Sequence, residues 1–294
     1  MNPVRQGVDV GGTTIKGLLV DADDTVLEQW TEQTPRDDRT GEQTIATIVS
    51  RIEASRWRTG IEAIGIVVPG LVDEDKGICR QSVNLGWKDV AVAGPLGDAL
   101  RLPIAFGHDV RAGALAEART GASARTPGVA AFLPIGTGLA AAYTHNGEVL
   151  TFGGLAGEVG QIRLLQGPHA GSTIEDIASA GAIARRLGVP NARRATDLVR
   201  AGDPAAVAVW NDALVILADV IAWITVTVGP ELVVIGGGLS ASADLLLPAL
   251  TQGLAARVAD APLPTIVKAA HGVSAGAVGA AQLAADVLRK GARQ

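Results

Sequence analysis

Residues Asp9–Lys16 read DVGGTTIK and place a carboxylate, two glycines, two hydroxyls and a lysine in one tight turn. Glycines let backbone N–H groups come close to phosphate oxygens, threonine hydroxyls donate further hydrogen bonds, and a lysine supplies positive charge. The acidic Asp9 is suited to hold Mg²⁺, directly or through water. The run therefore indicates a polyphosphate-binding hairpin, with a glycine-rich turn and a solvated lysine as the plainer alternative. The phosphate-binding candidates are Gly11, Gly12, Thr13, Thr14 and Lys16.

Two further glycine turns follow apolar segments of strand length in the second half of the chain. Gly136-Thr137-Gly138 follows Val129–Ile135, and Gly236-Gly237-Gly238 follows Leu232–Ile235. A single turn of this kind is commonly only a turn, but backbone without side chains can also pack against phosphate or a flat ring. Three such turns, in the order hairpin, hairpin, strand-to-helix turn, predict a nucleotide site.

The chain has 294 residues, of which 48% are hydrophobic and 19% charged, so one large or two smaller folded domains are expected. Apolar runs alternate with helical patterns, which indicates α/β layers. The first three strands follow one another closely and predict an antiparallel meander. Thr40 and Gln43 can form a capping box for a helix that reaches Trp57. Later segments predict a helix over Thr173–Leu187 and a long helix over Ala205–Val228.

The charge and cysteine content of the chain exclude several classes of partner. The net charge is −5 and no run of lysine or arginine stands out, so no nucleic-acid partner is expected. The single cysteine, Cys79, cannot form an internal disulfide or a CxxC metal site, which favours the cytoplasm. No basic and apolar leader precedes the first strand, which predicts no secretory signal. The longest uncharged stretch, Thr126–Gly147, is broken by Pro134 and by glycines, so no membrane span is expected there.

The order of the three turns resembles that of the actin-like, ribonuclease-H-like ATPases, an α/β fold in which two α/β domains hold a nucleotide in an interdomain cleft. Within that group the chain resembles the ROK family of sugar kinases and repressors over nearly its whole length. The resemblance implies a smaller domain of residues 1–107 with 275–294, and a larger domain of residues 108–274. The stretches that carry it are Asp9–Lys16, Ile64–Asp73, Asn84–Trp87, His108–Glu117, Gly154–Gln161 and Ile235–Ser240.

The resemblance implies an ATP-dependent, Mg²⁺-assisted kinase that phosphorylates the 6-hydroxyl of glucose or a close relative. Asp109 matches the catalytic aspartate, and a carboxylate there can accept the hydroxyl proton as the bond to phosphorus forms. A cap for the following helix is the structural alternative for Asp109. The turns at residues 11–14 and 136–138 are implied to hold the phosphates, and the turn at residues 236–238 the adenosine. The implied sugar contacts are Gly70, Asn84, His108, Asp109, Glu158, Gln161 and Glu175.

Two positions depart from the family pattern. His108 stands where many members have asparagine, which leaves the preferred sugar open, and a packed core histidine is the plainer interpretation. Gln161 stands where many members have a zinc-binding histidine, and the loop Gln166–Thr173 has none of the cysteines that would complete the zinc site. The sequence therefore predicts no zinc, and either some other packing that holds Glu175 or weakened sugar binding.

Two alternatives to a glucose kinase stay open. One is an N-acylhexosamine kinase that acts on N-acetylmannosamine or N-acetylglucosamine, and the other is a non-catalytic sugar-binding pseudokinase. A repressor is disfavoured because eight residues precede Asp9, too few for a helix-turn-helix module. The expected partner is a small-molecule sugar, and the resemblance suggests a homodimer.

Overall fold

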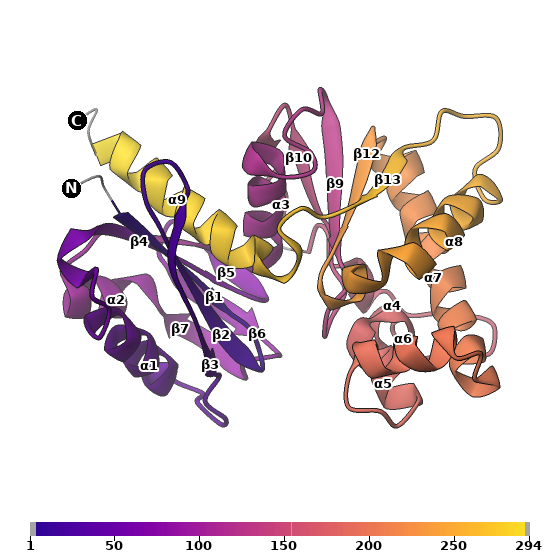
Figure 1. Ribbon diagram of the computed structural model, residues 1–294, viewed down its shortest axis with the longest axis horizontal. Helices are drawn as coiled ribbons and strands as arrows, with labels where there is room; N and C mark the ends of the chain where they lie inside the picture. Colours follow the sequence, from indigo (N-terminus) through magenta and orange to yellow (C-terminus); the bar gives the residue numbers. More distant parts are fainter. Residues whose placement is uncertain (1–3, 154, 292–294) are drawn as a thin grey trace. The chain divides into compact units, whose positions relative to one another are not determined.

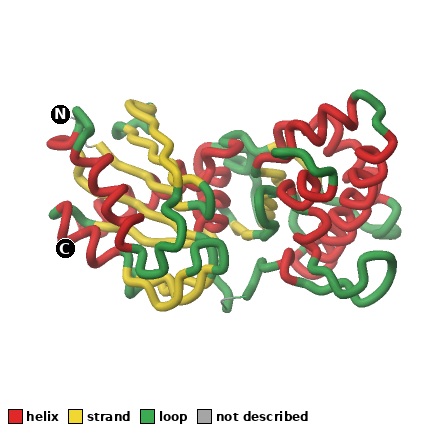
Figure 2. Tube along the Cα trace, turned by 90° about the horizontal axis from the view of Figure 1, so that it is seen from below, coloured by secondary structure: helices red, strands yellow, loops and turns green. Residues whose placement is uncertain are grey.

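The computed structural model describes residues 4–153 and 155–291. Within these ranges the chain forms two compact units, each of which has its own sheet and helices (Figures 1 and 2). Unit 1 comprises the residues up to Ala116 together with those from Ser274 onward, and unit 2 comprises Glu117–Val273. The chain therefore passes from one unit to the other twice. The domain division inferred from the family resemblance, at residues 107/108 and 274/275, stays a prediction.

Unit 1 is built on a five-stranded sheet. Its strands, in sheet order, are β3 (Val26–Gln33), β2 (Thr14–Val20), β1 (Val4–Val10), β4 (Ile61–Val68) and β8 (Ile104–His108). β2 pairs antiparallel with both β1 and β3, which confirms the expected meander. β1, β4 and β8 run parallel, with Asp9 opposite Val67 and Val68 opposite His108. The carboxyl ends of these three strands therefore meet at one edge of the sheet, where open α/β sheets bind their ligands.

Two helices, α1 (Glu42–Glu53) and α2 (Ala93–Leu100), cover one face of this sheet, and Figure 1 shows them on the same side. Because side chains alternate across a strand, every second residue of β1 and β4 reaches this face. Val8 and Ile66 are fully buried there, in one cluster with Ile48 of α1. The alternating pattern of these strands thus supplies the core of unit 1.

The opposite face of the sheet receives α9 (Ala275–Gly291), where the strands present glycines. A Cβ added to Gly7 of β1 would lie 2.0 Å from the carbonyl oxygen of Ala277, and one added to Gly65 of β4 would lie 1.7 Å from that of Ala280. Such distances are far shorter than any real contact, so no larger residue fits at either position without moving the helix. The backbone of α9 therefore rests directly on β1 and β4.

The first turn of α1 is not closed by the expected capping box. Gly41, rather than Thr40, is the residue before the helix, and its left-handed conformation brings no side chain to the turn. The buried carboxylate of Asp38 instead accepts hydrogen bonds from the backbone N–H groups of Gln43 and Thr44, at 3.3 and 2.8 Å. The prediction for Thr40 and Gln43 is wrong because a charged acceptor, placed further upstream, takes the same donors.

A small antiparallel sheet lies beyond β4 and was not predicted from the sequence. Its strands are β5 (Leu71–Asp73), β6 (Ile78–Ser82) and β7 (Trp87–Ala91). The turn between β6 and β7 carries Asn84. This sheet therefore brings the Asn84–Trp87 motif into unit 1.

Unit 2 is built on a second five-stranded sheet. Its strands, in sheet order, are β11 (Glu148–Val149), β10 (Ala142–His145), β9 (Val129–Pro134), β12 (Leu232–Gly236) and β13 (Thr265–Lys268). β9, β12 and β13 run parallel, whereas β10 pairs antiparallel with β9 and β11. The glycine turns that follow β9 and β12 therefore lie at the same edge of this sheet.

The helix expected over Thr173–Leu187 is two helices, α4 (Ile174–Ala178) and α5 (Ala180–Arg186). Ser179 between them is extended, and its hydroxyl accepts a hydrogen bond from the backbone N–H of Ala182 at 3.0 Å. The single long helix is thus a wrong prediction, because serine offers the backbone a capping bond in place of a helical one.

The long helix α7 (Pro204–Val228) lies among α4, α5, α6 (Ala192–Arg200) and α8 (Ala243–Ala255). Within the described ranges it is the one helix whose length and apolar composition would suffice to cross a membrane. Its Leu217 and Ile221 are fully buried in the core of unit 2. α7 is therefore the central core helix of that unit.

Candidate functional site

The turn after β1 is held by its own backbone and by a neighbouring strand end. The N–H of Gly11 donates to the carbonyl of Thr14 at 2.9 Å, and the hydroxyl of Thr34 donates to the carbonyl of Gly11 at 2.6 Å. A Cβ added to Gly12 would lie 3.0 Å from the carbonyl oxygen of Asn84. Two candidates far apart in the sequence, Gly12 and Asn84, are therefore neighbours in unit 1.

Asp9 lies at the carboxyl end of β1, opposite Lys16 on β2. The first turn of α9 closes over it, since a Cβ added to Gly276 would lie 2.6 Å from Oδ2 of Asp9. Burial, and to a smaller extent the negative charge of Asp109, raise the pKa of Asp9 to about 7, although Lys16 opposes both effects. Asp9 and Asp109 are therefore close enough to repel each other when both are ionised.

Asp109 lies where β8 ends and α3 (Asp109–Thr120) begins. Its carboxylate accepts a hydrogen bond from the backbone N–H of Val110 at 2.7 Å, within the first turn of the helix. Burial nevertheless raises its pKa to about 6, against the lowering effects of the Val110 bond and of Arg111. A carboxylate of this kind is ionised at neutral pH and is more basic than an ordinary aspartate, which suits it to accept a proton.

His108 is buried at the end of β8, beside Asp109. Its Nδ1 lies 3.4 Å from the backbone N–H of Arg111, and its Nε2 lies 3.5 Å from Oδ1 of Asp109. Burial lowers the pKa of His108 to about 4, with a further contribution from Arg111, so the imidazole is neutral. An Nδ1 that accepts from Arg111 leaves the ring proton on Nε2, the nitrogen that faces Asp109.

Arg111 and Glu74 are neighbours of the site that sequence reasoning missed. The guanidinium of Arg111 donates from Nη2 and Nε to Oε1 of Glu74, at 2.7 and 3.1 Å. Arg111 lowers the pKa values of both His108 and Asp109. The sequence offered one indication of this pair, the position of Arg111 two residues after Asp109. It offered none for Glu74, which lies in the turn between β5 and β6, two strands that were not predicted.

The residues that flank the two glycine turns of unit 2 connect them by hydrogen bonds. The N–H of Ile135 donates to the carbonyl of Gly236 at 3.0 Å, and the N–H of Leu239 donates to the carbonyl of Ile135 at 3.1 Å. Gly237 has a φ of +71°, and a Cβ there would lie 2.5 Å from the carbonyl oxygen of Ile135. Only glycine fits this position without strain. The structure therefore brings residues 136–138 and 236–238 together at one edge of the unit 2 sheet.

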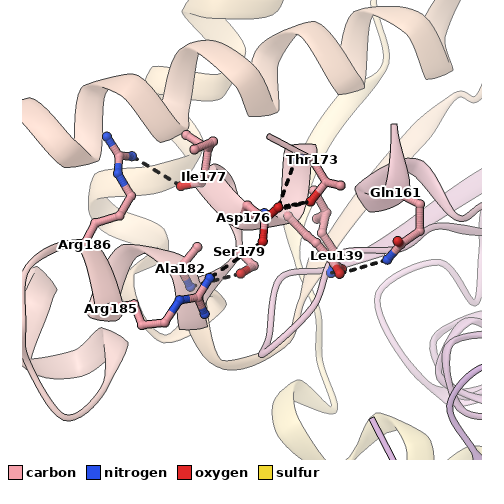
Figure 3. A network of polar contacts seen from close by, with 10 residues as sticks. Leu139, Gln161, Thr173, Asp176, Ile177, Ser179, Ala182, Arg185 and Arg186 are labelled. Carbon is pink, nitrogen blue, oxygen red and sulfur yellow. Dashed lines mark hydrogen bonds and ion pairs between the residues drawn. The ribbon is translucent and has the colours of Figure 1, made fainter. Parts of the chain in front are cut away.

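Glu175 and Gln161 are hydrogen-bonded to each other in unit 2. Nε2 of Gln161 donates to Oε1 of Glu175 at 2.8 Å, and the N–H of Leu139 lies 3.4 Å from Oε2 of the same carboxylate. Figure 3 shows Gln161 pointing toward Leu139, which directly follows the glycine turn at residues 136–138. A capping box between Thr173 and Asp176 fixes the helix that carries Glu175. The carboxylate of Glu175 is thus held next to the glycine turn at residues 136–138.

Glu158 precedes a short 3-10 helix (Val159–Gln161) and is half-buried. The preceding Gly157 has a φ of +95°, and a Cβ there would lie 2.0 Å from the carbonyl oxygen of Ala141. The glycine therefore lets the motif pack against the segment that leads into β10. Gly154, the first residue of the motif, lies outside the described residues.

The residues at the expected place of a zinc loop do not fit that metal. Within residues 4–153 and 155–291, no group of three or more His, Cys, Asp or Glu side chains gathers in a way that could hold a metal ion. His169 lies 3.3 Å from Oδ2 of Asp212 on α7, which also accepts from Arg186 at 2.7 Å. The loop is further closed by Arg163, which donates to the carbonyl of Gly171 at 3.0 Å. Hydrogen bonds and ion pairs thus hold this loop.

Comparison with known proteins agrees with the geometry. The model of the ROK family matches residues 5–287. A glucokinase of Halalkalibacterium halodurans is 29% identical over 292 residues, covering 86% of this chain and 87% of the relative. An N-acetylgalactosamine kinase of Shewanella sp. (strain ANA-3) is 28% identical, covering 94% of this chain and 95% of the relative. The structure of a ROK family glucokinase from Streptomyces griseus in complex with glucose and AMPPNP matches with a TM-score of 0.85 at 23% identity, covering 96% of this chain and 99% of that one. The expected actin-like ATPase fold is therefore confirmed.

Proposed function

The chain belongs to the ROK family and is an ATP-dependent sugar kinase, and from this premise we propose that it phosphorylates the 6-hydroxyl of glucose or a close relative. One observation carries the proposal. A carboxylate of raised pKa, that of Asp109, lies at the same sheet edge as the glycine turn after β1, close enough to Asp9 to raise the pKa of that residue. A proton acceptor beside a phosphate-binding turn is what phosphoryl transfer to a hydroxyl requires.

Asp109 is the general base of this proposal. A sugar hydroxyl becomes a good nucleophile as its proton leaves, and the Asp109 carboxylate accepts that proton while the oxygen bonds to phosphorus. Its hydrogen bond with the N–H of Val110 fixes one oxygen, so the other is available to the hydroxyl. The Nε2 proton of His108 adds a second group that orients the carboxylate.

The nucleotide contacts are assigned to glycine turns in both units. In unit 1, the backbone of Gly11 and Gly12, the hydroxyls of Thr13 and Thr14, and the ammonium of Lys16 are suited to phosphate oxygens. In unit 2, Gly136-Thr137-Gly138 serves the phosphates, and Gly236-Gly237-Gly238 packs against adenosine. The hydrogen bonds of Ile135, which directly precedes the first turn, with Gly236 and Leu239 support the assignment, because adjacent parts of one ligand need adjacent sites.

Asp9 fits a magnesium ion that arrives with ATP. Its carboxylate is desolvated and has a raised pKa, so a neighbouring cation would stabilise the ionised form. Mg²⁺ commonly takes one or two carboxylates, with substrate phosphates and water as its other ligands. When bound, the ion would offset negative charge on the phosphates.

The sugar contacts are assigned to Gly70, Asn84, His108 and Asp109 in unit 1 and to Glu158, Gln161 and Glu175 in unit 2. Carboxylates and amides suit vicinal hydroxyls because they offer two hydrogen-bonding atoms in one plane. Glu175 keeps this capacity while Gln161 orients it. An N-acylhexosamine kinase is the second candidate, favoured by the similarity to the N-acetylgalactosamine kinase and by the family asparagine that His108 replaces.

We also propose a cytoplasmic homodimer with no nucleic-acid partner. The single buried cysteine and the acidic net charge support the compartment and the lack of a nucleic-acid partner. Light scattering of the purified protein measures the mass in solution, and a monomer at micromolar concentration would contradict the dimer.

The test of the proposed function is ADP release from ATP with a panel of sugars. Glucose, mannose, N-acetylmannosamine, N-acetylglucosamine and N-acetylgalactosamine are compared at equal concentration, and the product is identified by mass spectrometry. We expect turnover with glucose or mannose and a loss of about three orders of magnitude in Asp109→Asn. Turnover confined to the N-acetylated sugars would establish the second candidate. Calorimetric sugar binding without any turnover would instead establish a pseudokinase.

A further inference from the structure

The chain passes between the two units at two places, once inside α3 between Ala116 and Glu117 and once between Val273 and Ser274. These crossings are more than 150 positions apart in the sequence. In both cases a helix of unit 1 is involved, because α3 enters the first crossing and α9 begins just after the second. Any hinge motion of the two units must pass through these two segments.

Glu117, the first residue after one crossing, bonds the segment just before the other. Its Oε1 accepts from the backbone N–H of His271 at 2.8 Å, and its Oε2 accepts from the N–H groups of Ala270 and Ala122 at 3.0 and 2.7 Å. The side chain of Glu117 is fully buried. The hydroxyl of Thr120 and Nε2 of His271 add a contact of 2.9 Å. All these contacts lie within unit 2.

The same two segments are also fixed to each other in unit 1. A Cβ added to Gly279 of α9 would lie 1.9 Å from the carbonyl oxygen of Ala112 in α3, so the two helix backbones touch. Ala112 is buried in one cluster with Ala280 of α9 and Val67 of β4. The two crossing segments are therefore bound together on either side of the crossing.

A buried carboxylate is expensive unless hydrogen bonds replace its hydration. Backbone N–H groups do so at Glu117, and two of them belong to the segment before the second crossing. Removing the carboxylate would leave partly buried N–H donors without this acceptor, which is costlier than the loss of a fully exposed bond. The hydrogen bonds of Glu117 therefore connect the two crossing segments to each other.

We propose that Glu117 is the positioning residue of a hinge, where its carboxylate joins the two crossings so that they bend together. The structural part of this proposal stands on the contacts alone. Its mechanistic part rests on the proposed function: coupled bending lets the kinase exclude water while the phosphoryl group is transferred, so that ATP is not hydrolysed. Glu117 acts through the backbone of the crossings and is assigned no contact with substrate.

Hydrogen exchange measured by mass spectrometry tests the structural part. In Glu117→Gln one carboxylate oxygen becomes an amide that donates, so it faces the backbone donors instead of accepting from them. We expect exchange to become faster by at least about tenfold in peptides covering both residues 117–124 and residues 266–274. The matched control is Asp38→Asn, because Asp38 is another buried carboxylate that accepts from backbone N–H groups, far from either crossing in sequence. It should leave both peptides unchanged. Faster exchange in only one of the two peptides would overturn the proposal.

A second variant guards against misfolding of Glu117→Gln. A Cβ added to Gly121 would lie 2.3 Å from Oε2 and 2.8 Å from Cα of Glu117, so Gly121→Ala displaces Glu117 without removing its carboxylate. We expect the same two peptides to exchange faster in Gly121→Ala. If this variant folds and neither peptide changes, the carboxylate does not join the crossings.

The mechanistic part is tested by the number of sugar phosphates formed per ATP consumed. Partial unfolding lowers transfer and hydrolysis together and leaves this ratio unchanged, whereas a hinge defect admits water and lowers the ratio. We expect a fall of roughly threefold to tenfold in Glu117→Gln and none in Asp38→Asn. An unchanged ratio would overturn the hinge role. A wild-type protein that phosphorylates no sugar would contradict the proposed function, and the exchange experiment would still decide whether Glu117 joins the crossings.

Discussion

Replacing the proposed base by its amide, Asp109→Asn, should lower activity by about three orders of magnitude and at the same time stabilise unit 1 in a pH-dependent way. Burial raises the pKa of Asp109 from 3.8 to about 6, so the folded protein binds this proton more tightly than the unfolded chain does. The stability that this group contributes is therefore complete below the unfolded pKa of about 3.8. It is lost as the pH rises through that value toward 6.

The size of the effect follows from the two pKa values. At pH 7.5 the shift corresponds to a cost of about 3 kcal/mol for holding the ionised carboxylate in the folded state. At pH 4.5 the folded carboxyl is protonated, and the remaining cost is about 1 kcal/mol. The asparagine oxygen can still accept the 2.7 Å hydrogen bond from the N–H of Val110. Asp109→Asn should therefore raise the free energy of unfolding by up to about 3 kcal/mol at pH 7.5 and by about 1 kcal/mol at pH 4.5.

Urea unfolding followed by circular dichroism at both pH values measures this difference. Asp73→Asn is the control within unit 1, because a hydrogen bond from Arg80 lowers the pKa of Asp73. The stability contributed by Asp73 is present above its unfolded pKa and is lost as the pH falls, so its replacement should destabilise unit 1 most at pH 7.5. The reasoning is refuted if Asp109→Asn is less stable than the wild type at pH 7.5, or if its gain is equal at both pH values.

Three other outcomes are expected. The value of kcat/KM should fall roughly tenfold between pH 7 and pH 5, because Asp109 must be ionised to accept a proton and its pKa is raised to about 6; a flat profile in initial-rate measurements would exclude it as the base. Gly237→Ala should destabilise unit 2 by more than about 2 kcal/mol, from a positive φ and the backbone it meets, whereas Gly238→Ala, with open space around it, should change the melting temperature little. Gln161→Ala frees Glu175 from its 2.8 Å hydrogen bond and should raise KM for the sugar several-fold with little change in KM for ATP, and equal changes in both would contradict a sugar-specific role.

The strands of the first meander and the glycine turns were predictable because their signals are local. Asp9–Lys16 carries its turn, its charges and its flanking apolar residues within eight positions, and the pairing of β1 with β2 follows from them. Asp109 could be placed at a strand-to-helix junction for the same reason. This pairing joins residues that are close in sequence, so single-sequence reasoning reaches it.

The parts that sequence reasoning missed depend on contacts between distant residues. Asp38 replaces the expected cap of α1 from a position that the helical pattern does not mark. Ser179 divides a helical stretch because its hydroxyl bonds the next turn. Glu117 looks like an ordinary helical glutamate until the chain returns at His271. In each case a polar side chain finds a backbone partner that composition and periodicity do not reveal.

The glycine-lined contact between α9 and the first sheet has a consequence for how the protein is made. Ribosomes extend the chain from its N-terminus, so β1 and β4 emerge long before residues 275–291, and all of unit 2 is synthesised between them. Unit 2 is a continuous segment and can fold as soon as it has emerged, whereas unit 1 must wait with one sheet face uncovered. That face, around Gly7 and Gly65, is therefore the surface that a nascent-chain chaperone would shield until α9 arrives.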